Sequence, residues 1–214
     1  MRIDLHVHSY CSFDALVKPA DVFQKVKESK IDGIALTDHN TAKGWKEFSL
    51  FANKKGFPFI KGEEIAIVEE GQRIGELLGF FMQEPIKPAS FEEVFGRLKE
   101  QDALVSVPHP FAWFTVPEKL LSKAVEKRFC IEGFNSRNFL GFMNKKALSF
   151  AGKHGLPCTA GSDAHVSQEI GNGFVESSAT ELEGLRKDLK KGKVSLKGKT
   201  SPLFYRLVSR LKAH

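Results

Sequence analysis

The sequence has few cysteines and no long apolar run. Its 214 residues include three cysteines, Cys11, Cys130 and Cys158, which lie far apart. An odd number of distant cysteines argues against a disulfide framework and favours a reducing, cytoplasmic setting. No stretch approaches about 18 consecutive apolar residues, which excludes a membrane span. The first residues, MRIDLHVHS, become polar at once and lack the apolar core of a signal peptide, so we expect a cytoplasmic protein.

Positive charge is concentrated at the C-terminal end of the sequence. The chain carries 32 Lys and Arg against 26 Asp and Glu, a formal charge of +6. Residues 186–214 hold ten of these basic residues and a single acid, Asp188, whereas residues 1–185 are slightly acidic. A solvated final helix is the simpler explanation of this segment. The functional explanation is a phosphate-rich partner.

Short apolar runs alternate with segments of helical spacing along the chain, and Gly or Pro often precedes the next run. This alternation predicts a parallel sheet covered by helices, and a Gly at the end of a helical segment is typical of a helix C-terminus. We therefore expect the α/β class and a seven-stranded, TIM-like β/α barrel. The expected strands are residues 3–8, 33–39, 59–65, 77–81, 104–109, 130–136 and 157–163.

No linker, repeat or low-complexity stretch divides the chain. We expect one domain, in which residues 1–185 form the barrel and the basic segment 186–214 is a helical addition packed on it. The helices expected between the strands are residues 19–30, 41–55, 91–101, 117–127 and 144–154.

Polar side chains end most of the expected strands. In a parallel barrel the carboxyl ends of the strands share one face, and active sites are built there. Five of the seven histidines lie at these ends, a concentration that packing does not explain. The side chains expected to converge are His6, His8, Asp38 or His39, Glu64, His109, Asn135, Asp163 and His165.

The spacing of the first two histidines suits metal binding. His6 and His8 are two residues apart on a strand, so both imidazoles point to one face and can hold one ion. Asp163 and His165 repeat this spacing at the last strand, provided that the extended backbone continues to His165. Imidazole and carboxylate together suit Zn, Mn or Fe, and a carboxylate can bridge two ions. We therefore prefer a metal centre to a set of unrelated packing histidines.

In their order and spacing these motifs resemble the PHP (polymerase and histidinol phosphatase) family of metal-dependent phosphoesterases, and its small stand-alone members in particular. The resemblance covers nearly the whole chain and implies a distorted seven-stranded β/α barrel, in agreement with the strands counted above. It rests on AspLeuHisValHisSer at 4–9, ThrAspHisAsn at 37–40, GlyGluGluIle at 62–65, ProHisPro at 108–110, GluGlyPheAsnSerArg at 132–137 and AlaGlySerAspAlaHis at 160–165.

The resemblance also implies two or three divalent metal ions (Mn, Zn or Fe) at one end of the barrel. Asp14 matches the acidic position after the first motif, although the usual SerAspGly reads SerPheAspAla here. The metal ligands implied by the resemblance are His6, His8, Asp14, His39, Glu64, His109, Asp163 and His165.

The chain departs from the family pattern at the fourth strand. Many members have a further histidine there, whereas residues 75–81 have none. Glu76 is either an oxygen ligand in its place or, as we prefer, a solvated charge away from the site. Asp38 points away from its neighbour His39 if the strand is regular, so we expect it to be a structural partner.

The implied activity is phosphoester hydrolysis. Two divalent ions about 3.5–4 Å apart activate a water and clamp the phosphoryl oxygens, so that no Ser or Cys nucleophile is required. His6, His8 and Asp163 would be essential through this metal-activated water, and Arg137, or else Lys18, would bind the phosphate. The expected partner is a small phosphorylated substrate, either a phosphomonoester, a nucleotide or a short oligonucleotide, and not a membrane.

Two features leave alternatives open. Phe111, Trp113 and Phe114 follow His109 and either stack on the substrate or cover the barrel rim. An amidohydrolase-type barrel shares an early His-x-His and a late Asp, but it needs a metal-bridging Lys that residues 77–81 lack. A non-catalytic RNA-binding or scaffold barrel would use the basic segment 186–214, but it has no need of six convergent ligands.

Overall fold

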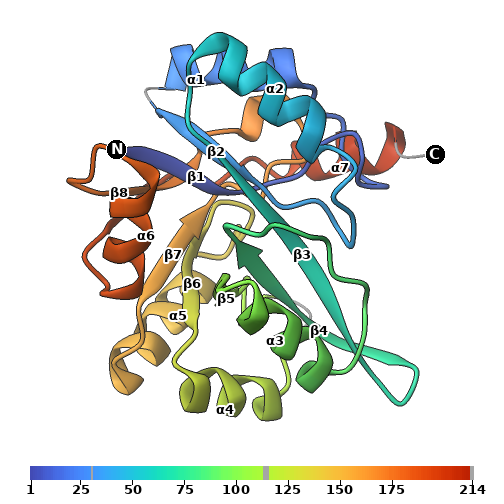
Figure 1. Ribbon diagram of the computed structural model, residues 1–214, viewed down its shortest axis with the longest axis vertical. Helices are drawn as coiled ribbons and strands as arrows, with labels where there is room; N and C mark the ends of the chain where they lie inside the picture. The colour runs from blue at the N-terminus through green and yellow to red at the C-terminus, as the bar shows by residue number, and fades with distance from the viewer. Residues whose placement is uncertain (30, 113–115, 213–214) are drawn as a thin grey trace.

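The computed structural model shows a nine-stranded mixed sheet that curves into a nearly closed barrel (Figure 1). The structure describes residues 1–29, 31–112 and 116–212. In hydrogen-bonded order the sheet runs β7-β6-β5-β4-β3-β2-β1-β8-β9. The strands are β1 (Arg2–Val7), β2 (Gly33–Leu36), β3 (Phe59–Glu69), β4 (Gln72–Phe80), β5 (Leu104–Val107), β6 (Cys130–Asn135), β7 (Cys158–Gly161), β8 (Gly173–Glu176) and β9 (Ser195–Gly198).

The α/β class is confirmed, but the predicted count of seven strands and the predicted parallel sheet were wrong. All seven expected strands form, yet β4 runs antiparallel to both β3 and β5. The two further strands, β8 and β9, pair antiparallel beside β1. Each has only four residues, and β9 is a largely exposed edge strand. Their sequences therefore lack the apolar run by which strands were recognised.

The barrel closes where β7 approaches β1. Gly161 lies so near β1 that an added Cβ would be 2.2 Å from the Cβ of His6. The backbone N–H of Asp163 donates to the carbonyl oxygen of His6 at 2.7 Å, and that of His8 donates to Ala164 at 2.9 Å. These contacts bring the last sequence motif beside the first. We call this end of the barrel, where the parallel strands end, the mouth.

Five helices cover the barrel between its strands, close to the predicted positions (Figure 1). Apolar residues such as Val22, Phe48 and Leu98 are fully buried under them. Gly56 and Gly155 end two of the helices with φ of 73° and 61°, the left-handed conformation predicted for glycine there. The helices are α1 (Pro19–Ser29), α2 (Trp45–Lys55), α3 (Phe91–Glu100), α4 (Glu118–Lys127) and α5 (Gly141–His154).

The described part of the basic segment, residues 186–212, continues the same structure. Its predicted start lies within α6 (Leu182–Lys190), whose Leu185 and Leu189 are fully buried. It then supplies β9 and α7 (Phe204–Lys212). Within the described part of the chain, no helix has the length and apolarity needed to cross a membrane.

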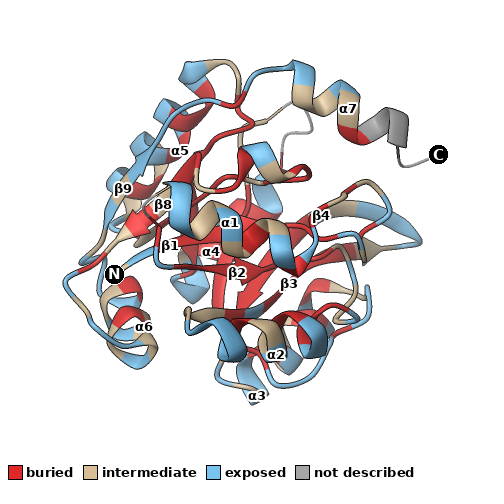
Figure 2. Cartoon of the chain, turned by 90° about the horizontal axis from the view of Figure 1, so that it is seen from above, coloured by how far each residue is buried: buried red, intermediate tan, exposed pale blue. Residues whose placement is uncertain are grey.

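Two clusters of buried apolar side chains support the site, and the strands that carry them form the buried centre of Figure 2. The larger cluster joins the sheet to its covering helices. The smaller one contains Ile60, Leu78 and Phe80. By strand alternation and register, these three share the face of the sheet that carries Glu64. They therefore form a packed apolar layer beneath the polar residues of the mouth.

Candidate metal centre

Two histidines at the end of β1, one within the strand and one directly after it, form the floor of the site. His6 and His8 alternate with Leu5 and Val7, so their imidazoles point to the same face, and both are fully buried. Their Nε2 atoms lie 3.0 Å apart. The pair presents two nitrogen donors to one small volume.

Glu64 of β3 lies between four histidines. Its Oε1 is 3.1 Å from Nε2 of His109 and 3.6 Å from Nε2 of His6. Its Oε2 is 2.9 Å from Nδ1 of His39 and 3.5 Å from Nε2 of His8. Each carboxylate oxygen therefore faces its own pair of imidazoles, the arrangement expected of a carboxylate that bridges two ions.

Asp163 reaches the cluster from the segment after β7. That strand ends at Gly161, and Asp163 has a φ of +57°, so the extended backbone predicted to continue to His165 is absent. Asp tolerates this left-handed conformation better than most residues. Its Oδ1 lies 3.4 Å from Nε2 of His8 and 3.7 Å from Nε2 of His6.

His165 and Asp14 form the outer part of the cluster. Nδ1 of His165 lies 2.8 Å from the carbonyl oxygen of Asp163. That acceptor holds the proton on Nδ1 and leaves the lone pair on Nε2. This Nε2 is 3.2 Å from Oδ2 of Asp14, whose Oδ1 is 3.6 Å from Nε2 of His39.

Asp38 fixes the loop that carries Asp14. It is fully buried and accepts hydrogen bonds from the backbone N–H and hydroxyl of Ser9 at 2.6 and 2.7 Å, and from the hydroxyl of Ser12 at 2.6 Å. Burial raises the pKa of this carboxyl, although the three hydrogen bonds oppose the rise. These bonds tie the loop after β1 to the segment that follows β2, which carries Asp38 and His39.

Glu76 belongs to the cluster, and the preferred expectation of a solvated charge away from the site was wrong. Because β4 runs antiparallel to β3, its first half lies toward the mouth. Glu64 pairs with Leu78, two residues from Glu76, so the two glutamates lie diagonally on one face. The Glu76 side chain is only 8% exposed, with oxygens 3.6 Å from Nδ1 of His39 and 3.9 Å from Nε2 of His109.

Carboxylates and imidazoles in the cluster shift one another's pKa. Burial alone would lower the pKa of His6, but the charges of Glu132, Asp163 and Glu64 outweigh it and hold the pKa well above its usual value. Burial would also lower the pKa of His109, but the adjacent Glu64 carboxylate outweighs burial and raises this pKa to about 9.

His8 behaves in the opposite way. Burial, and then electrostatic repulsion from the neighbouring imidazoles of His39 and His165, hold its pKa well below the usual value, so His8 is neutral and can offer a lone pair to a metal ion. Burial would raise the pKa of Asp14, yet contacts with histidines lower it to about 2.

The pKa values of Glu64 and Asp163 lie well below their usual range, against the effect of burial. Protons on imidazoles thus compensate the charged carboxylates of this largely buried cluster. A bound divalent ion would supply the same compensation.

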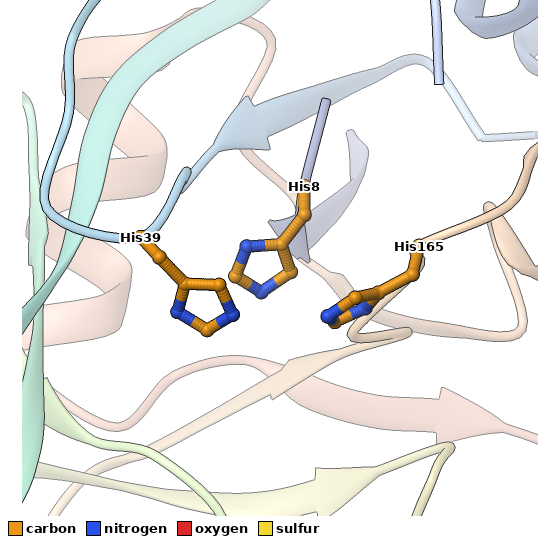
Figure 3. A group of neighbouring side chains, drawn as sticks. All are labelled: His8, His39 and His165. Atoms are coloured by element: carbon orange, nitrogen blue, oxygen red, sulfur yellow. The ribbon is translucent and has the colours of Figure 1, made fainter. Parts of the chain in front are cut away.

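The donor atoms fit divalent metal ions. Three overlapping groups have their donor atoms within 4.8 Å of one another. Ligands bound to one ion at about 2.0–2.2 Å lie at most about 4.4 Å apart, so small adjustments suffice. Figure 3 shows the rings of one group turned toward a common space. The groups are His8–His39–His165, His6–His8–Glu64 and His39–Glu64–Glu76.

Buried polar atoms without a hydrogen-bond partner support the same interpretation. Among the described residues they include Nδ1 of His39 and Oδ1 of Asp14, which both face this cluster, whereas Oε1 of Glu76 also pairs with the guanidinium of Arg73. Leaving such atoms unpaired costs stability unless something else satisfies them. The residues present therefore fit a metal centre.

Glu132 of β6 is a functional candidate that the sequence analysis missed. Its Oε1 lies 2.8 Å from Nδ1 of His6. Its Oε2 accepts the backbone N–H of His109 at 2.7 Å and the amide of Asn135 at 2.9 Å. Glu132 thereby holds the proton of His6 on Nδ1 and leaves Nε2 facing the site. The signal was its position at the start of the GluGlyPheAsn motif, from which only Asn135 had been selected.

Asn135 lies among the residues with which it was expected to converge. Its amide nitrogen also lies 3.2 Å from Oδ2 of Asp163, and its Oδ1 accepts the backbone N–H of Arg137 at 2.9 Å. It therefore orients Asp163 and Glu132 together.

Arg137 is buried behind the cluster. Its Nε donates to Glu169 at 3.0 Å and one terminal nitrogen donates to Ser209 of α7 at 3.2 Å. The other oxygen of Glu169 accepts the backbone N–H of His165 at 3.0 Å. The positive charge of Arg137 also contributes to the low pKa of Asp163. Lys18, the other phosphate candidate, is exposed beside the start of α1.

The aromatic residues near the mouth differ from those expected. Phe111 is half-buried and packs edge-on against Phe150, with 5.9 Å between ring centroids. Trp113 and Phe114 lie outside the described residues. Phe13, which had not been considered, is 73% exposed, and its ring lies 5.5 Å from that of His39.

Comparisons with known proteins identify the family. Residues 4–99 match the model of the PHP domain, and residues 141–194 match the PHP-associated model. The chain is 35% identical over 193 residues to uncharacterized protein MJ0417 of Methanocaldococcus jannaschii, an alignment that covers 86% of this chain and 73% of that protein. The chain therefore belongs to the PHP family, as its motifs predict.

Two further comparisons concern the fold of the chain and a shorter segment of its sequence. A two-domain protein of Bacteroides vulgatus containing a predicted PHP-like metal-dependent phosphoesterase has the same fold, with a TM-score of 0.77 at 20% identity; the match covers 93% of this chain and 65% of that one. The 3′,5′-nucleoside bisphosphate phosphatase of Chromobacterium violaceum is 33% identical over 88 residues, which is 41% of this chain and 30% of that enzyme.

Proposed function

We propose that the chain is a metal-dependent phosphoesterase whose site holds two or three divalent ions. The observation that carries the proposal is Glu64, whose two oxygens face separate pairs of histidines at 2.9–3.6 Å. The metals proposed are Mn, Zn or Fe, because the donors are imidazoles and carboxylates. The proposed ligands are His6, His8, Asp14, His39, Glu64, Glu76, His109, Asp163 and His165.

When bound, the ions would act as Lewis acids toward a phosphoryl oxygen and make water acidic enough to attack at neutral pH. Neighbouring residues of the chain hold the proposed ligands in position. Glu132 keeps the proton of His6 on Nδ1, so that Nε2 points inward. Asn135 donates to Asp163 and holds its carboxylate in position. His6, His8 and Asp163 are therefore the residues whose loss should be most damaging.

Differences in exposure define how a substrate enters. The side chains of His6, His8 and Glu64 are at most 1% exposed, whereas those of Asp14 and His109 are each 24% exposed. A phosphate group would therefore approach from the side of Asp14 and His109. On this side the exposed ring of Phe13 offers an apolar surface to the organic part of a substrate.

Arg137 would act on a bound phosphate chiefly through its charge. Two of its nitrogens already donate to Glu169 and Ser209. Its charge nevertheless reaches Asp163, and buried charges act strongly over short distances.

The proposed substrate is a small phosphomonoester, a nucleotide or a short oligonucleotide. The match to the nucleoside bisphosphate phosphatase of Chromobacterium violaceum supports a nucleotide, through a shared segment that covers 41% of this chain.

The proposal is tested with protein that has been stripped of metal and reloaded with Mn, Zn or Fe(II). Phosphate release is measured with an aryl phosphate and with a nucleoside 3′,5′-bisphosphate. We expect metal-dependent release that is lost in His8→Ala and retained in His154→Ala, which removes a histidine of α5 outside the cluster. No release from either substrate by protein loaded with two or more ions would contradict the proposal.

The same experiment separates the alternatives. An amidohydrolase-type enzyme would cleave an amide instead of a phosphate ester, although the bridging position here is occupied by Glu64 and not by Lys. A non-catalytic RNA-binding or scaffold barrel would hydrolyse neither and would not require bound metal.

A further inference from the structure

A groove of about 720 Å³ lies on the outer side of the barrel, beside the metal centre. It is bounded by the segment after β2, the first half of α2, the start of β3 and the segment after β4. Trp45 anchors α2 along one wall, because its indole N–H donates to the carbonyl oxygen of Gly62 in β3 at 2.8 Å. The groove therefore has rigid elements on two sides.

The charged residues that line this groove are all positive. They are Lys43, Lys46, Lys61 and Lys87, and no Asp or Glu is among the lining residues that the structure describes. Each of these side chains is exposed. Within the described part of the chain, none of the four forms an ion pair, whereas Lys25, Lys123, Lys127 and Lys190 do. Four cations without an acidic partner among the described residues, of which Lys61 also lies 5.9 Å from the centre of the Trp45 ring, produce a positive potential along the groove that suits a polyanion.

The groove begins next to the proposed ligands. Asn40 lines it and directly follows His39, and the backbone N–H of Asn40 donates to the carbonyl oxygen of Glu64 at 3.0 Å. Lys43 is four residues from His39, at most about 15 Å along the backbone. Phosphates of one duplex strand follow each other at about 3.4 Å along the axis. A chain of a few nucleotides is therefore long enough to reach the groove from the mouth.

We infer that this groove binds the non-reacting phosphates of a single-stranded oligonucleotide whose terminal phosphate lies at the metal centre. The inference rests on the proposed function and narrows its substrate class. A single aryl phosphate has no charge to place in the groove and gains nothing from it. A substrate with several phosphates gains binding energy from each lysine it reaches.

The test uses two pairs of substitutions, Lys43→Gln with Lys46→Gln and Lys61→Gln with Lys87→Gln. The matched control is Lys54→Gln with Lys153→Gln, which removes two exposed charges outside the groove, one of them from the same helix α2. Binding of a fluorescent, 5′-phosphorylated phosphorothioate hexauridylate, which resists hydrolysis, is measured by anisotropy with metal-loaded protein between 50 and 300 mM salt. Hydrolysis of an aryl phosphate is measured in parallel.

We expect each groove pair to weaken hexauridylate binding roughly tenfold at low salt and to reduce the slope of log K against log salt by about 1.4, which is about 0.7 for each charge removed. The control pair should bind as the unmodified protein does, and kcat/KM for the aryl phosphate should be unchanged in all variants. Equal binding by groove and control variants would overturn the inference. If the metal-loaded unmodified protein releases phosphate neither from the aryl phosphate nor from the nucleoside 3′,5′-bisphosphate, the proposed function fails, while the binding data still decide the role of the groove.

Discussion

Replacing Glu132 by Gln tests whether a residue that touches no substrate sets the metal affinity of the site. The Glu132 carboxylate receives three contacts: Nδ1 of His6 at 2.8 Å, the backbone N–H of His109 at 2.7 Å and the amide of Asn135 at 2.9 Å. Gln has the same shape, but it has one oxygen and one NH₂ group in place of two oxygens. It cannot accept from both sides at once.

Either orientation of the new amide has a cost. If its oxygen faces His6, the NH₂ group meets the donors of His109 and Asn135. If its NH₂ group faces His6, the imidazole proton must move to Nε2, which then cannot bind a metal. A buried donor left unpaired costs about 1–3 kcal/mol. Loss of such a supporting carboxylate typically lowers metal affinity about 10- to 100-fold, which is about 1.4–2.8 kcal/mol.

The assay is a competition titration of chelator-treated protein with Mn or Zn. Glu63→Gln is the matched control, because Glu63 is also a fully buried carboxyl and lies on the opposite face of β3 from Glu64. We expect a 10- to 100-fold loss in Glu132→Gln and little change in Glu63→Gln. Unchanged affinity in a folded Glu132→Gln protein would refute the reasoning that Glu132 fixes the tautomer of His6.

Three further predictions concern the ions, the donor set and stability. His8→Ala should lower turnover at least about 100-fold with an unchanged circular dichroism spectrum; turnover at the rate of the unmodified protein would remove the first motif from the site. Elemental analysis should find at least two Mn or Zn per reloaded chain and a lower content in Glu76→Gln; fewer than one ion in the unmodified protein would contradict a multinuclear centre. Burial raises the pKa of Glu63 from 4.5 to about 7, so the folded state binds this proton more tightly and the associated stability is lost as pH rises from about 4.5 to about 7. Glu63→Gln should remove this dependence, and its stability relative to the unmodified protein should rise by about 2–3 kcal/mol between pH 5 and pH 8 in urea unfolding; a constant difference would place the Glu63 pKa near its ordinary value.

Local rules explain which parts of the fold and site could be predicted from sequence. Alternation along β1 is enough to put His6 and His8 on one face. The helices follow from apolar spacing, and glycines such as Gly56 and Gly155 mark their ends. The ordered motifs at successive strand ends predict the converging side chains. None of these inferences depends on how segments distant in the sequence pair with one another.

The errors concern features that depend on pairing. An apolar run such as residues 77–81 reads the same in either strand direction, so the antiparallel course of β4 could not be recognised. The short edge strands β8 and β9 depend on partners rather than on their own composition. Glu132 was missed because its role depends on one 2.8 Å contact with a residue 126 positions away.

The direction of β4 also decides the chemistry of the centre. A parallel strand offers the mouth only its last residues, and here those would be Gly79 and Phe80. Because β4 is antiparallel, its first half instead lies toward the mouth, and Glu76 lies diagonally beside Glu64. We propose that this oxygen donor takes the place of the histidine that the family resemblance leads one to expect on this strand. One donor group, His39–Glu64–Glu76, becomes rich in carboxylate, while another, His8–His39–His165, is entirely imidazole. Carboxylates favour Mn and imidazoles favour Zn or Fe, so the two sides of one cluster differ in the ions they suit.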